Sequence, residues 1–189
     1  MTGVQTCALP IQHASDRILG LMNRDSTNKS LCDTLSRLRK SIPDIHVRTT
    51  LIVGFPGENE DDFATLFDFV EEQKFSRLGV FTYSKEEGTI AAEMDGQISD
   101  DVKKRRLDTI MERQMEISLE SNREKVGSIF QVLIDSVEED GTCMGRTEFD
   151  APEIDNSVIF VPNKPHRPGD MARVEILEAF DYDLEGREV

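Results

Sequence analysis

The residues best able to do chemistry lie at three points in the first half of the sequence. Gln12 and His13 follow one short apolar stretch, residues 54–58 (GFPGE) follow a second, and residues 83–85 (YSK) follow a third. Ligands of parallel α/β proteins bind beyond the carboxyl ends of the strands, so these segments form the candidate site. Gly54 and Gly57 have no side chain and would let a ligand approach the backbone.

Two polar residues lie on the second apolar stretch itself. Arg48 and Thr50 alternate with apolar neighbours, so both could point into the lumen of a barrel. The guanidinium group of Arg48 is suited to holding a carboxylate through two parallel hydrogen bonds. A purely structural explanation stays open for each candidate: GFPGE as a tight turn, Tyr83 as a core residue and Glu58 as a carboxylate in the first turn of a helix.

The elements expected around these residues alternate between strands and helices. Strands are expected over residues 8–11, 45–53 and 78–83, and helices follow the Ser15-Asp16 cap, cover residues 30–40 and begin again near Glu60. This order predicts an α/β architecture with parallel strands. A long charged helix is expected over residues 100–125, with the basic run 103–106 largely solvated.

The pattern changes near Val126-Gly127, after which only strands and turns are expected. The predicted strands cover residues 129–137, 142–147, 158–161 and 171–179, with turns at residues 139–141 and 168–170. Short strands at this spacing are typical of a small antiparallel barrel of the OB-like kind.

Composition narrows the possible classes of protein. The 189 residues carry a formal net charge of −15 and contain no apolar run long enough to cross a bilayer, so a cytoplasmic location is expected by default. The cysteines and histidines are scattered and form no metal-ligand motif, which favours reduced thiols and predicts no metal site. These residues are Cys7, Cys32, Cys143, His13, His46 and His166.

The order of the motifs resembles the radical S-adenosylmethionine (SAM) methylthiotransferase family. Residues 9–17 are similar to the family's fourth-strand segment, residues 48–58 to its fifth-strand signature and residues 81–89 to its sixth. The resemblance implies the C-terminal part of a radical SAM partial (β/α) barrel over residues 9–125 and a TRAM-like β-barrel over 126–189. Residues 1–8 do not match the family and are interpreted as a scar.

The resemblance also implies cofactors and their binding residues. The family uses SAM and two 4Fe–4S clusters, and the cofactor-binding candidates are Gln12, Arg48, Thr50, Gly54 and Tyr83. The cluster-binding CxxxCxxC motif does not occur in this sequence. We therefore expect neither catalytic residues nor metal ligands in this chain, no iron incorporation and no activity of this segment alone.

Two features favour the protein-modifying RimO branch over the tRNA-modifying MiaB branch. Gln12 is followed by residues 13–16 (HASD), where the tRNA branch tends to have serine after the glutamine. Residues 126–189 contain five Arg or Lys against fifteen Asp or Glu, a formal charge of −10, whereas an RNA-binding barrel should be basic. The expected substrate is an aspartate of a basic small-subunit ribosomal protein, on the ribosome. A tRNA methylthiotransferase and a non-catalytic partner-binding module remain the alternatives.

Overall fold

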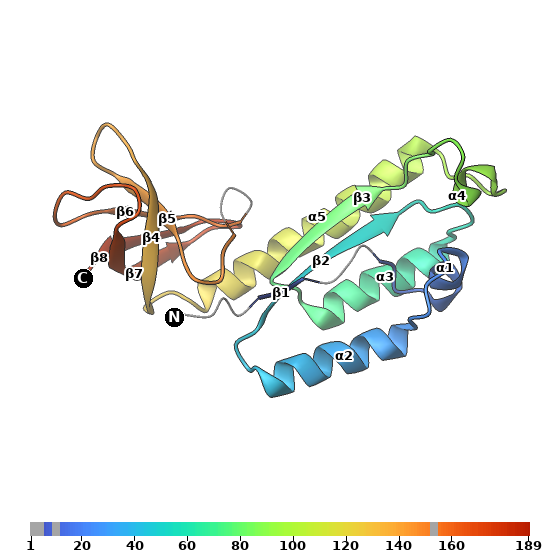
Figure 1. Cartoon of the computed structure of the whole chain (residues 1–189), viewed down its shortest axis with the longest axis horizontal. Coiled ribbons are helices and arrows are strands. Elements are labelled where there is room, and N and C mark those ends of the chain that lie inside the picture. Colours follow the sequence, from blue (N-terminus) through green and yellow to red (C-terminus); the bar gives the residue numbers. More distant parts are fainter. Residues whose placement is uncertain (1–5, 9–11, 152–154) are drawn as a thin grey trace. The chain divides into compact units, whose positions relative to one another are not determined.

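The computed structural model describes residues 6–8, 12–151 and 155–189, which divide into two compact units. We term Cys7–Gln114 the sheet unit and Met115–Val189 the barrel unit (Figure 1). The division precedes the boundary expected near residue 126, because the last turns of a long helix belong with the barrel unit. Within the described ranges, no helix is both long and apolar enough to span a bilayer.

The sheet unit contains three strands in the order β1-β2-β3 (Figure 1). They are β1 (Thr6–Ala8), β2 (His46–Val53) and β3 (Arg77–Thr82). Strands β2 and β3 are parallel, in register from Arg48 opposite Arg77 to Val53 opposite Thr82. The expected α/β architecture with parallel pairing is thus confirmed. The strand predicted over residues 8–11 falls largely on residues 9–11, which lie outside the described part.

Helices connect and follow these strands. They are α1 (Asp16–Leu21), α2 (Asn28–Ser41), α3 (Glu60–Gln73), the short α4 (Ile90–Glu93) and α5 (Asp100–Arg123). Each of the first three begins at a polar cap, because the first N–H groups of a helix have no partner within it. Ser15, Thr27 and Asn59 supply these caps, the last two as reciprocal capping boxes. Right-handed crossovers in a sheet of sequential order place α2 and α3 on the same face.

The prediction that the basic run on α5 is largely solvated holds for Lys104 and Arg105, which are exposed, but is wrong for the other two residues. Lys103 and Arg106 are only 8% and 3% exposed. The aliphatic carbons of Lys103 pack against Gly54, and the guanidinium of Arg106 forms ion pairs with Glu58 and Glu60. Long cationic side chains bury their stems when a carboxylate lies near the head group, and a helical charge pattern alone does not reveal that partner.

The barrel unit is a closed five-stranded barrel in the order β4-β5-β6-β8-β7. Its strands are β4 (Ile129–Val137), β5 (Cys143–Arg146), β6 (Val158–Val161), β7 (Met171–Ala179) and β8 (Leu184–Glu188). Alternate side chains point inward and form a core that includes Val132, Ile134, Phe160, Val174 and Ile176. An OB-like barrel is therefore confirmed.

Strand β8 was not predicted, and it changes the expected antiparallel pattern. It pairs antiparallel with β7 but parallel with β6. Its sequence, LEGRE, buries one apolar residue, Leu184, and so shows no apolar alternation. Gly186 is required at this position, because a Cβ atom there would lie 2.5 Å from Val174 Cγ1 and 2.6 Å from the Glu175 carbonyl oxygen.

Candidate functional site

The two faces of strand β2 differ in burial. Val47, Leu51 and Val53 on one face are buried, whereas Arg48 and Thr50 on the other face are half-buried. Successive side chains of a strand point to opposite faces, so Arg48 and Thr50 share the less covered face. The structure therefore brings these two predicted site residues together on the face opposite the apolar core.

Strand β3 extends this open face. Residues in register share a face, so Gly79 lies beside Thr50, and Phe81 lies beside Ile52 near the carboxyl ends of both strands. Phe81 is 59% exposed, a high value for a large apolar residue on a strand. At the other end, Arg77 lies directly opposite Arg48. The face thus combines a cationic end, a hydroxyl and an apolar end.

Gln12 is not on this face. It forms a parallel bridge with Leu51, and its side-chain amide donates a hydrogen bond to Thr49 Oγ1 at 3.3 Å. Thr49 is 1% exposed and Gln12 is 5% exposed. The side chain of Gln12 therefore lies in the buried layer, apart from Arg48 and Thr50.

Gly54 and Tyr83 are occupied by contacts within the protein. Tyr83 is buried, and its ring packs edge-on against Phe55 with centroids 5.4 Å apart. Lys103 Nζ lies 5.6 Å from the centre of the same ring. Gly54 has a φ of +74°, and a Cβ atom there would lie 2.3 Å from Lys103 Cγ. The missing side chain at Gly54 thus makes room for α5.

A buried ionic cluster holds the GFPGE turn. Glu58 is 2% exposed, and its Oε2 accepts hydrogen bonds from the backbone N–H groups of Gly54 (2.7 Å) and Phe55 (3.3 Å). Its Oε1 accepts from Arg106 NH1 at 2.8 Å. Glu58 lies before α3 and folds back onto the turn, so the alternative explanation of Glu58 as a carboxylate in the first turn of a helix is wrong. The turn and α5 are joined through this one carboxylate.

His13 completes the cluster at the end of the first segment. It is fully buried, and its Nδ1 accepts a hydrogen bond from the Ser15 backbone N–H at 2.9 Å. A neutral ring that accepts at Nδ1 carries its proton on Nε2. That nitrogen faces Glu58 Oε2 at 3.6 Å, a favourable electrostatic contact although too long for a hydrogen bond.

A second ionic group fixes α1 against α3. Asp62 accepts hydrogen bonds from Ser15 Oγ (2.6 Å), from the Asn59 backbone N–H (2.9 Å) and from Arg17. Burial alone would raise the pKa of Asp62, but the hydrogen bonds from Arg17, Ser15 and Asn59 outweigh it, so the pKa is lowered. The carboxylate therefore stays ionised and secures the start of both helices.

Sequence reasoning missed Arg106 as the partner of Glu58. The sequence does contain an acidic residue, Glu58, after a buried strand and a basic run on a later helix. It gives no indication that Glu58 and Arg106 lie next to each other in the fold. No three described His, Cys, Asp or Glu side chains are grouped so that they could hold a metal ion. The described ionisable residues near the turn thus serve structure and positioning.

Comparisons with known proteins cover both units. Residues 2–70 match the Radical SAM superfamily, and residues 126–189 match the TRAM domain. The ribosomal protein uS12 methylthiotransferase RimO of Pelotomaculum thermopropionicum is 49% identical over 183 residues, which are 96% of this chain and 41% of the relative. RimO of Acetivibrio thermocellus (49%) and of Clostridioides difficile (48%) each match 94% of this chain and 40% of the relative.

Over 94–96% of its length the chain is thus similar to radical SAM methylthiotransferases of the RimO type, with a Radical SAM match followed by a TRAM match. It spans about two fifths of the length of the curated RimO proteins that it matches. The Radical SAM match includes strand β2 and most of α3 in the sheet unit, and the TRAM match includes the described strands of the barrel unit.

Proposed function

We propose that the chain is the C-terminal part of an enzyme that adds a methylthio group to the β-carbon of an aspartate in ribosomal protein uS12. The observation that carries this proposal is the 49% identity to RimO across 96% of the chain, which includes both units. In this proposal the sheet unit contributes one wall of the SAM site, and the barrel unit binds the protein substrate.

The open face of β2 and β3 fits SAM in chemical terms. SAM carries a carboxylate, ribose hydroxyls and a planar apolar base. The guanidinium of Arg48 suits the carboxylate, Thr50 suits a hydroxyl, and the exposed ring of Phe81 suits stacking with the base. When bound beside an iron–sulfur cluster, SAM supplies the radical that abstracts hydrogen from the substrate.

In this proposal Gln12, Gly54 and Tyr83 do not contact SAM; they position the elements that carry the open face. Gln12 ties the segment before α1 to β2 through its backbone N–H to the Thr50 carbonyl oxygen (3.0 Å). Gly54 and Tyr83 hold α5 against the turn. The described residues offer no ligand set for a 4Fe–4S cluster, so no step is assigned to such a cluster here.

The charge of the barrel unit supports a basic protein as the substrate. Its last 64 residues carry a formal charge of −10, which attracts a cationic protein and repels a phosphate backbone. Ribosomal proteins of the small subunit are strongly basic. The acidic barrel therefore favours uS12 over tRNA as the partner and supports association at the ribosome.

Binding of the whole chain to uS12 and to tRNA tests this proposal. We expect fluorescence anisotropy to show tighter binding of labelled uS12 than of labelled tRNA at about 0.15 M salt, with affinity for uS12 falling as salt rises. If tRNA bound as tightly as uS12 or more tightly, the result would contradict the proposal and favour a tRNA methylthiotransferase. No binding of either would remove the proposed role of the barrel.

A further inference from the structure

One row of outward-facing side chains crosses the barrel unit. Leu133 on β4 lies in register with Arg146 on β5 and with Met171 on β7. The neighbours of Leu133 on its own strand, Val132 and Ile134, point into the core, so the row faces outward. Met171 is 54% exposed. Leu133 and Met171 are therefore adjacent apolar side chains on the outside of an acidic barrel.

This row forms the floor of a pocket of about 550 Å³. The loop after β5 supplies its rim, where the exposed Glu148 and the half-buried Asp150 place two carboxylates. Asp150 is held in place, because its Oδ2 accepts a hydrogen bond from Thr147 Oγ1 at 2.6 Å. The cation in the pocket, Arg146, forms an ion pair with Asp135. The pocket therefore offers an apolar floor and an acidic rim.

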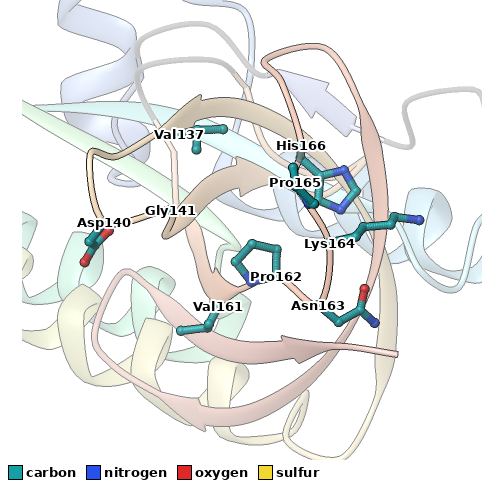
Figure 2. A pocket seen from close by; sticks show the side chains of 9 residues that line it. All are labelled: Val137, Asp140, Gly141, Val161, Pro162, Asn163, Lys164, Pro165 and His166. Carbon is teal, nitrogen blue, oxygen red and sulfur yellow. The ribbon is translucent and has the colours of Figure 1, made fainter.

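A second pocket of the same barrel has different chemistry. Figure 2 shows it between Asp140 on the β4–β5 hairpin and the segment that runs from Val161, the last residue of β6, to Lys164 and His166. Here Asp140 Oδ1 accepts the Thr142 backbone N–H at 2.9 Å, so this carboxylate is used by the hairpin. Lys164 adds a positive charge. An ion pair with Glu188 offsets part of that charge. With a single carboxylate among its lining residues, already bonded within the hairpin, this pocket should attract a cationic side chain less and provides a comparison.

We propose that the pocket formed by Leu133, Met171 and Glu148 binds a lysine or arginine side chain of the basic protein substrate. Such a side chain has an apolar stem and a cationic head, which match the floor and the rim respectively. The inference rests on the proposed function and deepens it, because it locates the contact within the barrel unit. It commits to a protein partner; binding of RNA is an outcome of the test.

The test measures the dissociation constant of the whole chain for labelled uS12 in two pairs of variants. Glu148→Lys reverses a charge at the pocket, and Glu139→Lys makes the same reversal at the exposed hairpin of the other pocket. Met171→Ala shortens the apolar floor, and Val161→Ala shortens an exposed apolar side chain in the second pocket. All four positions are outside the barrel core, and circular dichroism checks that each variant is folded.

We expect Glu148→Lys to weaken binding about tenfold or more, because a like charge then meets the bound cation directly. Glu139→Lys should cost about threefold or less, through long-range attraction that salt screens. Met171→Ala should cost about threefold to tenfold, from lost apolar contact, and Val161→Ala should leave the dissociation constant unchanged.

The outcomes separate the two proposals. If wild-type chain binds uS12 but Glu148→Lys and Glu139→Lys weaken it equally, the pocket is not the contact, and only this inference fails. If wild-type chain prefers tRNA or does not bind uS12, the proposed function itself fails. A selective loss in both pocket variants supports both proposals.

Discussion

Arg106→Met should destabilise the sheet unit far more than Arg105→Met does. The Arg106 side chain is 3% exposed and donates to the fully buried carboxylate of Glu58 at 2.8 Å. The side chain of its neighbour Arg105 is 63% exposed, and its NH2 lies 3.5 Å from Glu60. The two substitutions remove the same group from adjacent positions of one helix. Their difference therefore isolates the burial of the ion pair.

The magnitudes follow from that burial. Removing one partner of a buried ion pair costs about 3–5 kcal/mol, because the other charge remains buried without it. Glu58 keeps its two backbone N–H donors from Gly54 and Phe55, which places the expected cost near the lower end, about 3 kcal/mol. An exposed pair such as Arg105–Glu60 contributes about 0–1 kcal/mol. The expected difference between the variants is about 2–3 kcal/mol.

Native-state hydrogen exchange measured by mass spectrometry can resolve this difference within one chain. Peptides from β2 and α3 report on the sheet unit, and peptides from β4 and β7 in the same sample serve as an internal reference. A loss of 2–3 kcal/mol corresponds to roughly a hundredfold faster exchange of the slowest amides. We expect this acceleration in Arg106→Met and only a slight one in Arg105→Met, with barrel peptides unchanged in both.

Equal exchange in the two variants would refute the reasoning, since it would mean that the Glu58–Arg106 contact is worth no more than a surface pair. A double-mutant cycle adds a second test. Glu58→Gln keeps the shape of the side chain and leaves Arg106 its ion pair with Glu60. The double variant with Arg106→Met should lose less stability than the two single losses added together, because both remove the same interaction.

Three further predictions concern single positions. Gly54→Ala should cost about 1–3 kcal/mol more than Gly88→Ala in thermal unfolding, since both have positive φ but only Gly54 faces a neighbouring side chain; equal losses would show that Lys103 yields freely. The pKa of Asp62 is lower in the folded protein than in the unfolded chain. The ionised Asp62 carboxylate therefore stabilises the fold at pH values above the ordinary aspartate pKa of about 3.9, and this stabilisation is lost as the pH falls through the pKa of the folded state. The stability gap between wild type and Asp62→Asn should therefore shrink below about pH 4, and a gap that widens there would contradict this sign. Glu178→Lys should stabilise the barrel by about 0.2–1 kcal/mol, because Glu178 lies directly opposite Glu185; a lower melting temperature would contradict it.

The parts of the fold with strong periodicity were predictable from sequence. The alternation of β2 placed Arg48 and Thr50 on one face, and the structure has them there. The burial along α3 likewise follows helical spacing, since Leu66 and Val70 lie four residues apart and both are buried. Periodic burial leaves a periodic sequence, so these features need no knowledge of distant partners.

The parts that depend on contacts distant in sequence were not predictable. The direction of Gln12 is set by its bridge to Leu51, 39 positions away in the sequence. The burial of Arg106 is set by Glu58, and β8 forms only because β6 and β7 leave their edges open beside it. A short segment such as LEGRE gains its strand conformation from neighbours that the local sequence does not identify.

The acidity of the barrel unit should cost stability, and the proposed binding of a basic protein would account for that cost. Glu178 and Glu185 lie opposite each other on β7 and β8, and like charges in directly opposite positions repel. Further along the same two strands, Glu175 lies opposite Arg187 and forms an ion pair with it. Strands β7 and β8 can therefore hold a stabilising pair of opposite charges. A barrel selected for stability alone would gain from a second pair at Glu178 and Glu185. The retained repulsion is explained if the negative surface attracts a basic protein, since electrostatic steering depends on the summed charge of a face more than on any single contact.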